Sequence, residues 1–310
     1  MQHIEPGTRA LVLAGGGAAG NAWELGLVAG LAEGGVDVTD ADVVIGTSAG
    51  ATVAAQVTSG TSAAGLYAAV LAESPSVPGD RPQAPRGTAR DVGDGPRHGP
   101  ARRVSGATYL EWSDAVIAAA EDASDMRRRM GAAALQRDSS GGADAARWRD
   151  VVAGRLPSLS WPQQRVLIAA VDARTGEPVV FDRDSGVALA DAVAASTSAM
   201  TPYRIGDGWY INGGYRRSEN ADLATGSERV LVLSPFGGRS RMPTAWRMDL
   251  ASQVQDLRAA GSRVQTVFPD AGAGDVFDAN ALDPSTRQQA ARGGYAQGRS
   301  LAGSVAGLWH

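Results

Sequence analysis

A serine in the first fifth of the chain lies in a pattern that makes serine hydroxyls reactive. Gly46-Thr47-Ser48-Ala49-Gly50 comes directly after the apolar run Val43-Val44-Ile45, and further apolar residues follow. This order predicts a strand, a sharp turn and a helix, the setting that exposes a serine as a nucleophile. Gly46 and Gly50 would give the turn its room, and the Ala49 amide would face negative charge on a substrate. The alternative is an ordinary strand-to-helix turn in a chain with 40 glycines.

A second glycine cluster follows the first apolar run. Residues 9–14 predict a strand that leads into Gly15, Gly16 and Gly17, with Gly20 shortly after them. Amides in such a loop can donate to an oxyanion, so we expect these three glycines and Ala49 to form an oxyanion hole. The same glycines fit a dinucleotide-binding fingerprint. That fingerprint is disfavoured because it needs an acidic residue at the end of the second strand, where Ser48 lies instead.

Few residues in this chain can act as a base for the serine. The histidines are His3, His98 and His310, which lie near the termini or in a stretch rich in proline and glycine, and all 29 basic residues are arginine. The absence of lysine excludes a Ser-Lys dyad, a Schiff base and a P-loop. A Ser-His-Asp triad is disfavoured, and a carboxylate is the natural candidate.

Composition narrows the function further. The chain has no cysteine, which excludes disulfides and thiolate ligands, and its histidines are not paired, so we expect neither a metal site nor a cofactor. The formal net charge of −4 argues against a nucleic-acid partner. The oligomeric state cannot be assigned from the sequence.

These motifs together resemble the patatin-like phospholipases, in which a glycine-rich oxyanion loop and Gly-x-Ser-x-Gly precede Asp-Gly-Gly or Asp-Gly-Ala. The third landmark is here Asn212-Gly213-Gly214, with residues 194–202 before it and residues 220–224 after it. The resemblance spans residues 9 to about 235. It implies a phospholipase A or esterase that cleaves acyl esters of lipids or small molecules through a serine and an aspartate, without histidine.

The residue at the aspartate position is the main departure from that family. Asn212 can form hydrogen bonds to Ser48, but an amide cannot take up the serine proton at neutral pH. Three explanations stay open: an engineered replacement of aspartate, a natural member with little or no activity, and a substitute carboxylate. The candidates for the substitute are Asp207, Glu219 and Asp222.

Three functional hypotheses follow. The first is a patatin-like lipid acyl hydrolase, impaired by Asn212. The second is a lipid-binding or regulatory protein that has kept the pocket and lost the base. The third is a histidine-dependent serine esterase using His98.

The alternation of strand-like and helix-like segments predicts an α/β fold: a three-layer sandwich with a mostly parallel central sheet flanked by helices. The clearest further strands are residues 43–45, 166–171, 179–181 and 230–233. We expect one patatin-like domain over residues 1–310, with a core over about 9–235 and a C-terminal helical extension over about 244–310.

Three segments outside the strands carry further expectations. Residues 74–106, rich in proline and glycine, are expected to form a mobile loop, either disordered or a lid. Residues 108–135 and 143–153 predict two helices that form a cap over the sheet, and another helix is expected from Pro284 to about Leu301.

The apolar run after Arg9 is too short for a secretion signal, and residues 43–72 are better explained as buried core than as a membrane span. We therefore expect a cytoplasmic location. The seven tryptophans are scattered along the sequence, and transient contact with a membrane surface stays open.

Overall fold

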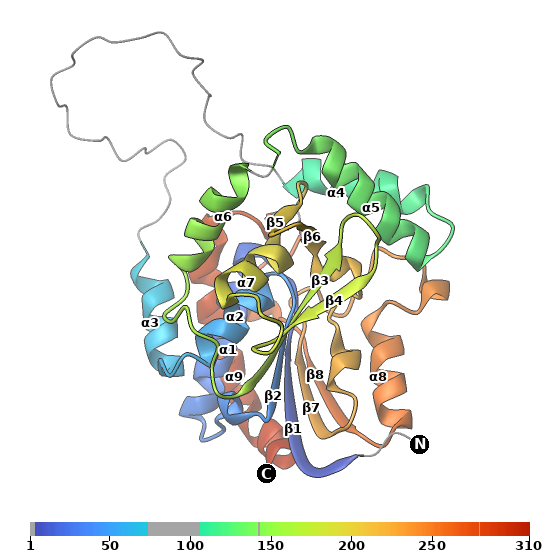
Figure 1. Cartoon of the computed structure of the whole chain (residues 1–310). Helices are drawn as coiled ribbons and strands as arrows, with labels where there is room; N and C mark the ends of the chain where they lie inside the picture. Colours follow the sequence, from blue (N-terminus) through green and yellow to red (C-terminus); the bar gives the residue numbers. More distant parts are fainter. Residues whose placement is uncertain (1–3, 74–105, 142, 279) are drawn as a thin grey trace, which may run out of the picture.

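The fold is built on an eight-stranded sheet (Figure 1). The computed structural model describes residues 4–73, 106–141, 143–278 and 280–310. The strands of the described residues are β1 (Glu5–Leu13), β2 (Val43–Gly46), β3 (Arg165–Asp172), β4 (Pro178–Phe181), β5 (Tyr203–Ile205), β6 (Gly208–Asn212), β7 (Ser227–Leu233) and β8 (Arg263–Val267).

The strand order brings distant segments to one edge of the sheet. The order is β5-β6-β3-β2-β1-β7-β8, with β4 also paired to β3. Strands β3, β2, β1, β7 and β8 are parallel to one another, whereas β4 and β6 run antiparallel to β3. Leu13 of β1 is in register with Gly46 of β2 and with Leu233 of β7. The loops that follow these three residues therefore leave the sheet side by side.

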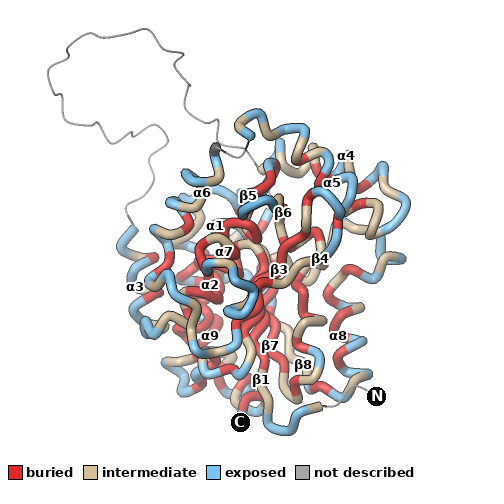
Figure 2. The backbone as a smooth tube through the Cα atoms, viewed as in Figure 1, coloured by how far each residue is buried: buried red, intermediate tan, exposed pale blue. Residues whose placement is uncertain are grey.

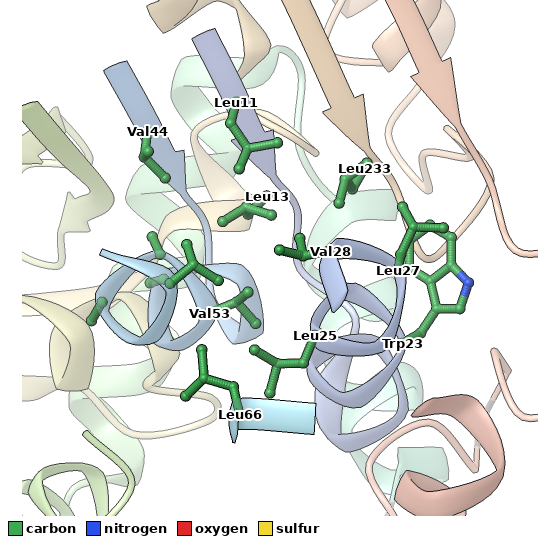
Figure 3. Packing of buried hydrophobic residues seen from close by; sticks show 14 of the residues in the cluster. Leu11, Leu13, Trp23, Leu25, Leu27, Val28, Val44, Val53, Leu66 and Leu233 are labelled. Carbon is green, nitrogen blue, oxygen red and sulfur yellow. The ribbon is translucent and has the colours of Figure 1, made fainter. Parts of the chain in front are cut away.

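Helices cover both faces of the sheet. Leu11 and Leu13 of β1 pack with residues of α1 and α2 (Figure 3), whereas Ala10 and Val12 pack with α8 on the opposite face. Figure 2 shows the resulting buried central strands between exposed outer helix faces. The helices are α1 (Gly17–Glu33), α2 (Ala49–Val57), α3 (Ala63–Ala72), α4 (Gly106–Ala118), α5 (Ala123–Arg137), α6 (Ala143–Ala153), α7 (Leu189–Thr197), α8 (Leu250–Ala259) and α9 (Arg287–Trp309). Short 3₁₀ turns are η1 (Val38–Asp40), η2 (Gly213–Tyr215), η3 (Ala221–Ala224), η4 (Thr244–Trp246), η5 (Ala271–Ala273) and η6 (Pro284–Thr286).

Helix α9 packs closely against α1 because both helices present glycines at the contact. A Cβ atom on Gly26 would lie 2.1 Å from the Ala291 carbonyl oxygen, and one on Gly30 would lie 2.2 Å from that of Tyr295. Larger residues at these positions would force the helices apart. Since β8 also pairs with β7, the sheet and its helical layer continue beyond residue 235.

The predicted fold class is confirmed: a mostly parallel sheet lies between layers of helices, and α4 and α5 pack over Val171 and Ile211 at one end. The predicted strands and the helix at 143–153 are present. Strands β5, β6 and β8 were not predicted, since each has only three to five residues. Helix α9 continues to Trp309, past the predicted end near Leu301.

The prediction of one helix over residues 108–135 is wrong. Helix α4 ends at Ala118, and Asp122 begins α5 by accepting a hydrogen bond from the Asp125 amide at 2.8 Å. Aspartate favours such an N-cap because its carboxylate satisfies an amide that has no partner in the first helical turn. The predicted lid or disordered loop at 74–106 lies outside the described residues, except for Gly106, which begins α4.

None of the helices in the described ranges is both long enough and apolar enough to cross a bilayer.

Candidate active site

Ser48 lies on a strained turn between β2 and α2. Its φ is +53° and its ψ is −119°, a conformation that residues with a side chain rarely adopt and that costs about 1–3 kcal/mol. The two flanking glycines make the turn possible. A Cβ atom on Gly50 would lie 2.1 Å from the Leu13 carbonyl oxygen, and one on Gly46 would lie 2.6 Å from the Ala51 Cα atom. The sequence pattern therefore forms the expected elbow, with Ser48 just before the first residue of α2.

The glycine loop after β1 lies directly against Ser48. A Cβ atom on Gly15 would lie 3.3 Å from Ser48 Cβ and 3.9 Å from its Oγ. Gly16 packs on Pro235, and Gly17, with φ +62°, packs on the Ala281 carbonyl. The loop is thus held between the serine on one side and residues that follow β7 and β8 on the other.

Unpaired amides lie in the glycine loop and on the residue that follows Ser48. Within the described ranges, the backbone amides of Gly15, Gly16, Gly17 and Ala49 have no hydrogen-bond acceptor. Their neighbours are occupied, because the Ala14 amide donates to Leu233, that of Ala19 to Ala281 and that of Gly20 to Gly16. Free amides at two helix N-termini are suited to stabilise a negatively charged oxygen.

The structure brings Asn212 to Ser48. Asn212 is the last residue of β6, and its Nδ2 atom donates a hydrogen bond to Ser48 Oγ at 3.0 Å. The Gly214 amide donates to Asn212 Oδ1 at 2.9 Å, which fixes the orientation of the side-chain amide. Gly213 fits between them only as glycine, because a Cβ atom there would lie 2.1 Å from the Ala169 carbonyl oxygen.

Ser196 was not among the predicted site residues. Its hydroxyl oxygen, on the buried side of α7, accepts a hydrogen bond at 2.9 Å from the Ser48 amide. The Ser48 amide is thereby occupied. In the sequence, residues 194–202 stood out because they accompany the Asn212 landmark. That pattern did not indicate a contact between Ser196 and Ser48.

The other candidate bases lie elsewhere. The Asp207 side chain is fully exposed, and Asp222 forms an ion pair with Arg216 at 2.7 Å. The Glu219 carboxyl group accepts hydrogen bonds from Ser218 and Ser234. Within the described part of the chain, none of these three carboxyl groups forms a hydrogen bond with Ser48.

The histidines give no support for a triad. His310 follows α9, where the neighbouring Trp309 bonds Asp37 and Asp40, which precede β2. His310 is thus at the opposite end of the sheet from Ser48. His3 and His98 lie outside the described residues.

Among the described residues, Glu219 and Glu24 are buried and form no hydrogen bond with Ser48. Burial raises the pKa of Glu219 from its ordinary value to about 7, although the Ser218 and Ser234 hydroxyls oppose the shift. Burial also raises the pKa of Glu24 in α1 well above its usual value, and the nearby Ala14 amide opposes the shift. The Glu24 oxygens have no hydrogen-bond partner within the described ranges.

The arrangement can support acyl transfer in part. Unpaired amides lie in the loop that contacts Ser48 and on the residue after it, and a side chain at position 212 lies within hydrogen-bonding distance of the serine oxygen. A carboxylate there could take the serine proton, whereas the amide present can only donate to the serine oxygen.

The family model described as patatin-like phospholipase matches residues 11–225. Among solved structures, VipD from Legionella pneumophila is 15% identical with a TM-score of 0.44, covering 97% of this chain and 68% of VipD. The type III effector protein ExoU is 18% identical with a TM-score of 0.41, covering 97% of this chain and 54% of ExoU, so this chain spans about half of ExoU's length.

No curated protein matches the chain. The family model covers more than half of the 310 residues and includes the glycine loop, Ser48 and Asn212. The chain therefore belongs to the patatin-like phospholipase family.

Proposed function

We propose that this chain has the site of a lipid acyl hydrolase, of the phospholipase A or esterase class, in which Ser48 attacks the carbonyl carbon of an ester. The observation that carries this proposal is the 3.0 Å contact between the Asn212 side chain and Ser48 Oγ. Family membership supports the lipid acyl hydrolase class. The unpaired amides beside the serine support the acyl-transfer chemistry.

With aspartate at position 212, the reaction has two steps. The carboxylate takes the Ser48 proton as Oγ bonds to the carbonyl carbon, and the amides of Gly15, Gly16, Gly17 and Ala49 hold the oxyanion. The ester C–O bond then breaks, and the protonated aspartate gives its proton to the leaving alcohol. In the second step the carboxylate takes a proton from water, which attacks the acyl-serine. The fatty acid leaves, and Ser48 regains its proton.

With asparagine at position 212, the first proton transfer has no acceptor. We expect turnover about a hundredfold to ten-thousandfold lower than with aspartate, the usual contribution of a general base. Substrate binding would change little, since asparagine and aspartate have nearly the same shape.

The second candidate is a lipid-binding or regulatory protein that does not catalyse. Asn212 itself favours this alternative. The Asn212 side-chain amide bonds both Ser48 Oγ and the Gly214 amide, so position 212 is hydrogen-bonded at both ends without a base.

Hydrolysis of p-nitrophenyl esters by this chain and by Asn212→Asp tests the proposal, with Ser48→Ala as background and intact mass confirming residue 212. We expect Asn212→Asp to gain about a hundredfold or more over the parent. If the parent and Asn212→Asp hydrolyse esters of short and long acyl chains no faster than Ser48→Ala, the hydrolase proposal fails and the lipid-binding candidate replaces it.

A further inference from the structure

The side chain of Asn220 connects the two segments that carry Ser48 and Asn212. Its Nδ2 atom donates to Thr47 Oγ1 at 2.9 Å and to the Gly213 carbonyl oxygen at 3.1 Å. Thr47 immediately precedes the serine, and Gly213 immediately follows the asparagine. One amide group thus bridges a neighbour of each residue of the candidate dyad.

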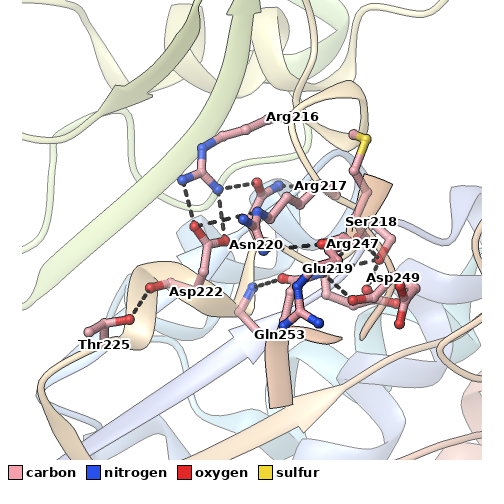
Figure 4. A network of polar contacts seen from close by, with 12 residues as sticks. Arg216, Arg217, Ser218, Glu219, Asn220, Asp222, Thr225, Arg247, Asp249 and Gln253 are labelled. Atoms are coloured by element: carbon pink, nitrogen blue, oxygen red, sulfur yellow. Dashed lines mark hydrogen bonds and ion pairs between the residues drawn. The ribbon is translucent and has the colours of Figure 1, made fainter. Parts of the chain in front are cut away.

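Asn220 is held in place on all sides. It is fully buried, and its φ of +59° is one that asparagine tolerates better than most residues. Nδ2 also donates to the Arg217 carbonyl at 3.2 Å, and Oδ1 accepts from Arg216 Nη1 at 2.7 Å. Arg216 is fixed in turn by two hydrogen bonds to Asp222, as Figure 4 shows. The bridge therefore has a rigid support outside the site.

Within the sheet, the strand that leads into Ser48 and the strand that ends at Asn212 are not hydrogen-bonded to each other. Strand β3 lies between β2, which leads into Ser48, and β6, which ends at Asn212. No ladder hydrogen bond can therefore join β2 to β6. Two other hydrogen bonds hold Thr47: its amide donates to the Leu13 carbonyl, and its hydroxyl donates to the Glu219 carbonyl. The Asn220 amide supplies the lateral contact between Thr47 and Gly213.

We propose that Asn220 is a positioning residue, which sets the separation of Ser48 and residue 212 through Thr47 and Gly213. This inference rests on the proposed function, because it concerns the geometry of the same pair. Asn220 itself touches neither Ser48 nor the reacting atoms. Its effect is on how often the residue 212 side chain and the serine oxygen are at hydrogen-bonding distance.

Thr47→Val is the mildest test, since it removes only the hydroxyl that receives the bridge and keeps the shape of the side chain. Asn220→Gly removes the bridge from the other end and permits the same positive φ. Thr58→Val is the matched control, because Thr58 is at the far end of α2 and, among the residues that the structure describes, its hydroxyl bonds only the Ala54 carbonyl. All three are made in the Asn212→Asp background, and active sites are counted by a burst titration.

We expect Thr47→Val and Asn220→Gly to lower kcat per titrated site by about tenfold to a hundredfold, because small displacements of a base have effects of this size. KM should stay within about twofold, and Thr58→Val should leave both constants unchanged. A purely structural role would lower the number of titrated sites and leave kcat per site as it was. That outcome, with Asn212→Asp active, overturns the inference and leaves the proposed function intact.

A second measurement uses the chain with Asn212 and needs no turnover. The Asn212 side-chain amide gives a ¹⁵N NMR signal, assigned by its loss in Asn212→Asp, that reports the hydrogen bond to Ser48. We expect Thr47→Val to shift this signal in the direction that Ser48→Ala does, and Thr58→Val to leave it in place. An unchanged signal in Thr47→Val overturns the positioning role. If Asn212→Asp has no turnover above Ser48→Ala, the proposed function fails and the NMR result alone decides the inference.

Discussion

The Nδ2 atom of Asn212 donates a hydrogen bond to Ser48 Oγ, so the serine oxygen is the acceptor in this contact. A general base needs the opposite direction, with the serine hydroxyl as donor. The Gly214 amide donates to Asn212 Oδ1 and so prevents the side-chain amide from turning round. With aspartate, the same Gly214 amide would favour the carboxylate form, and the free oxygen would accept the Ser48 proton. One substitution would thus reverse the hydrogen bond without a change of backbone.

Ser196 is expected to contribute to turnover by fixing the strained backbone of Ser48. Ser196→Ala leaves the partly buried Ser48 amide without its acceptor, at a cost of about 1 kcal/mol. Part of that cost should appear as a displacement of the Ser48 hydroxyl. In the Asn212→Asp background we expect kcat to fall by about tenfold, measured with p-nitrophenyl esters.

Ser198→Ala is the matched control for this prediction. Ser198 follows α7 directly, and its hydroxyl donates to the Ala195 and Tyr210 carbonyls and not to Ser48. An equal loss of kcat in both variants would show that disturbance of the end of α7, rather than the contact with Ser48, causes the effect.

Gly50 is expected to be irreplaceable in the elbow. A methyl group there would lie 2.1 Å from the Leu13 carbonyl oxygen, a backbone atom of the central strand that cannot move aside. We expect Gly50→Ala to lower the free energy of unfolding by about 1–3 kcal/mol and to abolish the activity gained with Asn212→Asp. Urea unfolding and ester hydrolysis measure the two effects.

Gly303→Ala provides the comparison, because Gly303 is exposed in α9 and no atom of the described part of the chain lies within 4 Å of the added methyl group. Replacing a glycine inside a helix should raise the free energy of unfolding by about 0.5–1 kcal/mol. If Gly50→Ala behaved in the same way, the elbow would be more adaptable than its contacts indicate.

The sequence located the residues of the candidate site that stand in local patterns. Ser48 and the glycine loop each follow an apolar strand, and Asn212 stands in a recognisable three-residue landmark. Ser196 and Asn220 were not given roles, because their contacts join residues 148 and 173 positions apart. No periodicity along the chain encodes which hydroxyl will face which amide after folding. Such contacts depend on strand order, which places β6 beside β3 and not beside β2.

Short elements limited the prediction of the fold in a similar way. Strand β8 has five residues, and four of them are not fully buried, so the apolar alternation is weak. Its position is set by pairing with β7 rather than by its own sequence. The division between α4 and α5 depends on one capping carboxylate at Asp122, within a stretch that otherwise favours helix.

Glu219 is expected to make the stability of the protein depend on pH. Its pKa is raised from 4.5 to about 7, so the folded protein keeps a proton that the unfolded chain loses between these values. The free energy of unfolding therefore falls as pH rises from about 4.5 to about 7. The fall is about 1.4 kcal/mol per pH unit, or roughly 3 kcal/mol in all. Below about pH 4.5 both states are protonated and the effect vanishes.

Glu219→Gln removes this titration. We expect the difference in unfolding free energy between about pH 5 and pH 8, measured with urea, to shrink by up to roughly 3 kcal/mol in the variant. Asp207→Asn serves as the control, since the Asp207 side chain is fully exposed. If the unfolding free energy of both variants changes with pH as steeply as that of the parent, the assignment of the pH dependence to Glu219 is wrong.

Glu24 is expected to destabilise the protein. Its carboxyl group is fully buried, the nearby Ala14 amide donates to Leu233 instead, and no partner satisfies either oxygen within the described ranges. Its pKa is raised well above 4.5 by burial, so ionisation of the unfolded chain lowers the stability as pH rises above that value. Glu24→Met, which fills the same space without a polar group, should raise the free energy of unfolding by about 1–3 kcal/mol, and by more near pH 8 than near pH 5. Urea titrations at the two pH values measure the gain, and a loss of stability at both would mean that the carboxyl group has a favourable partner, such as a buried water molecule.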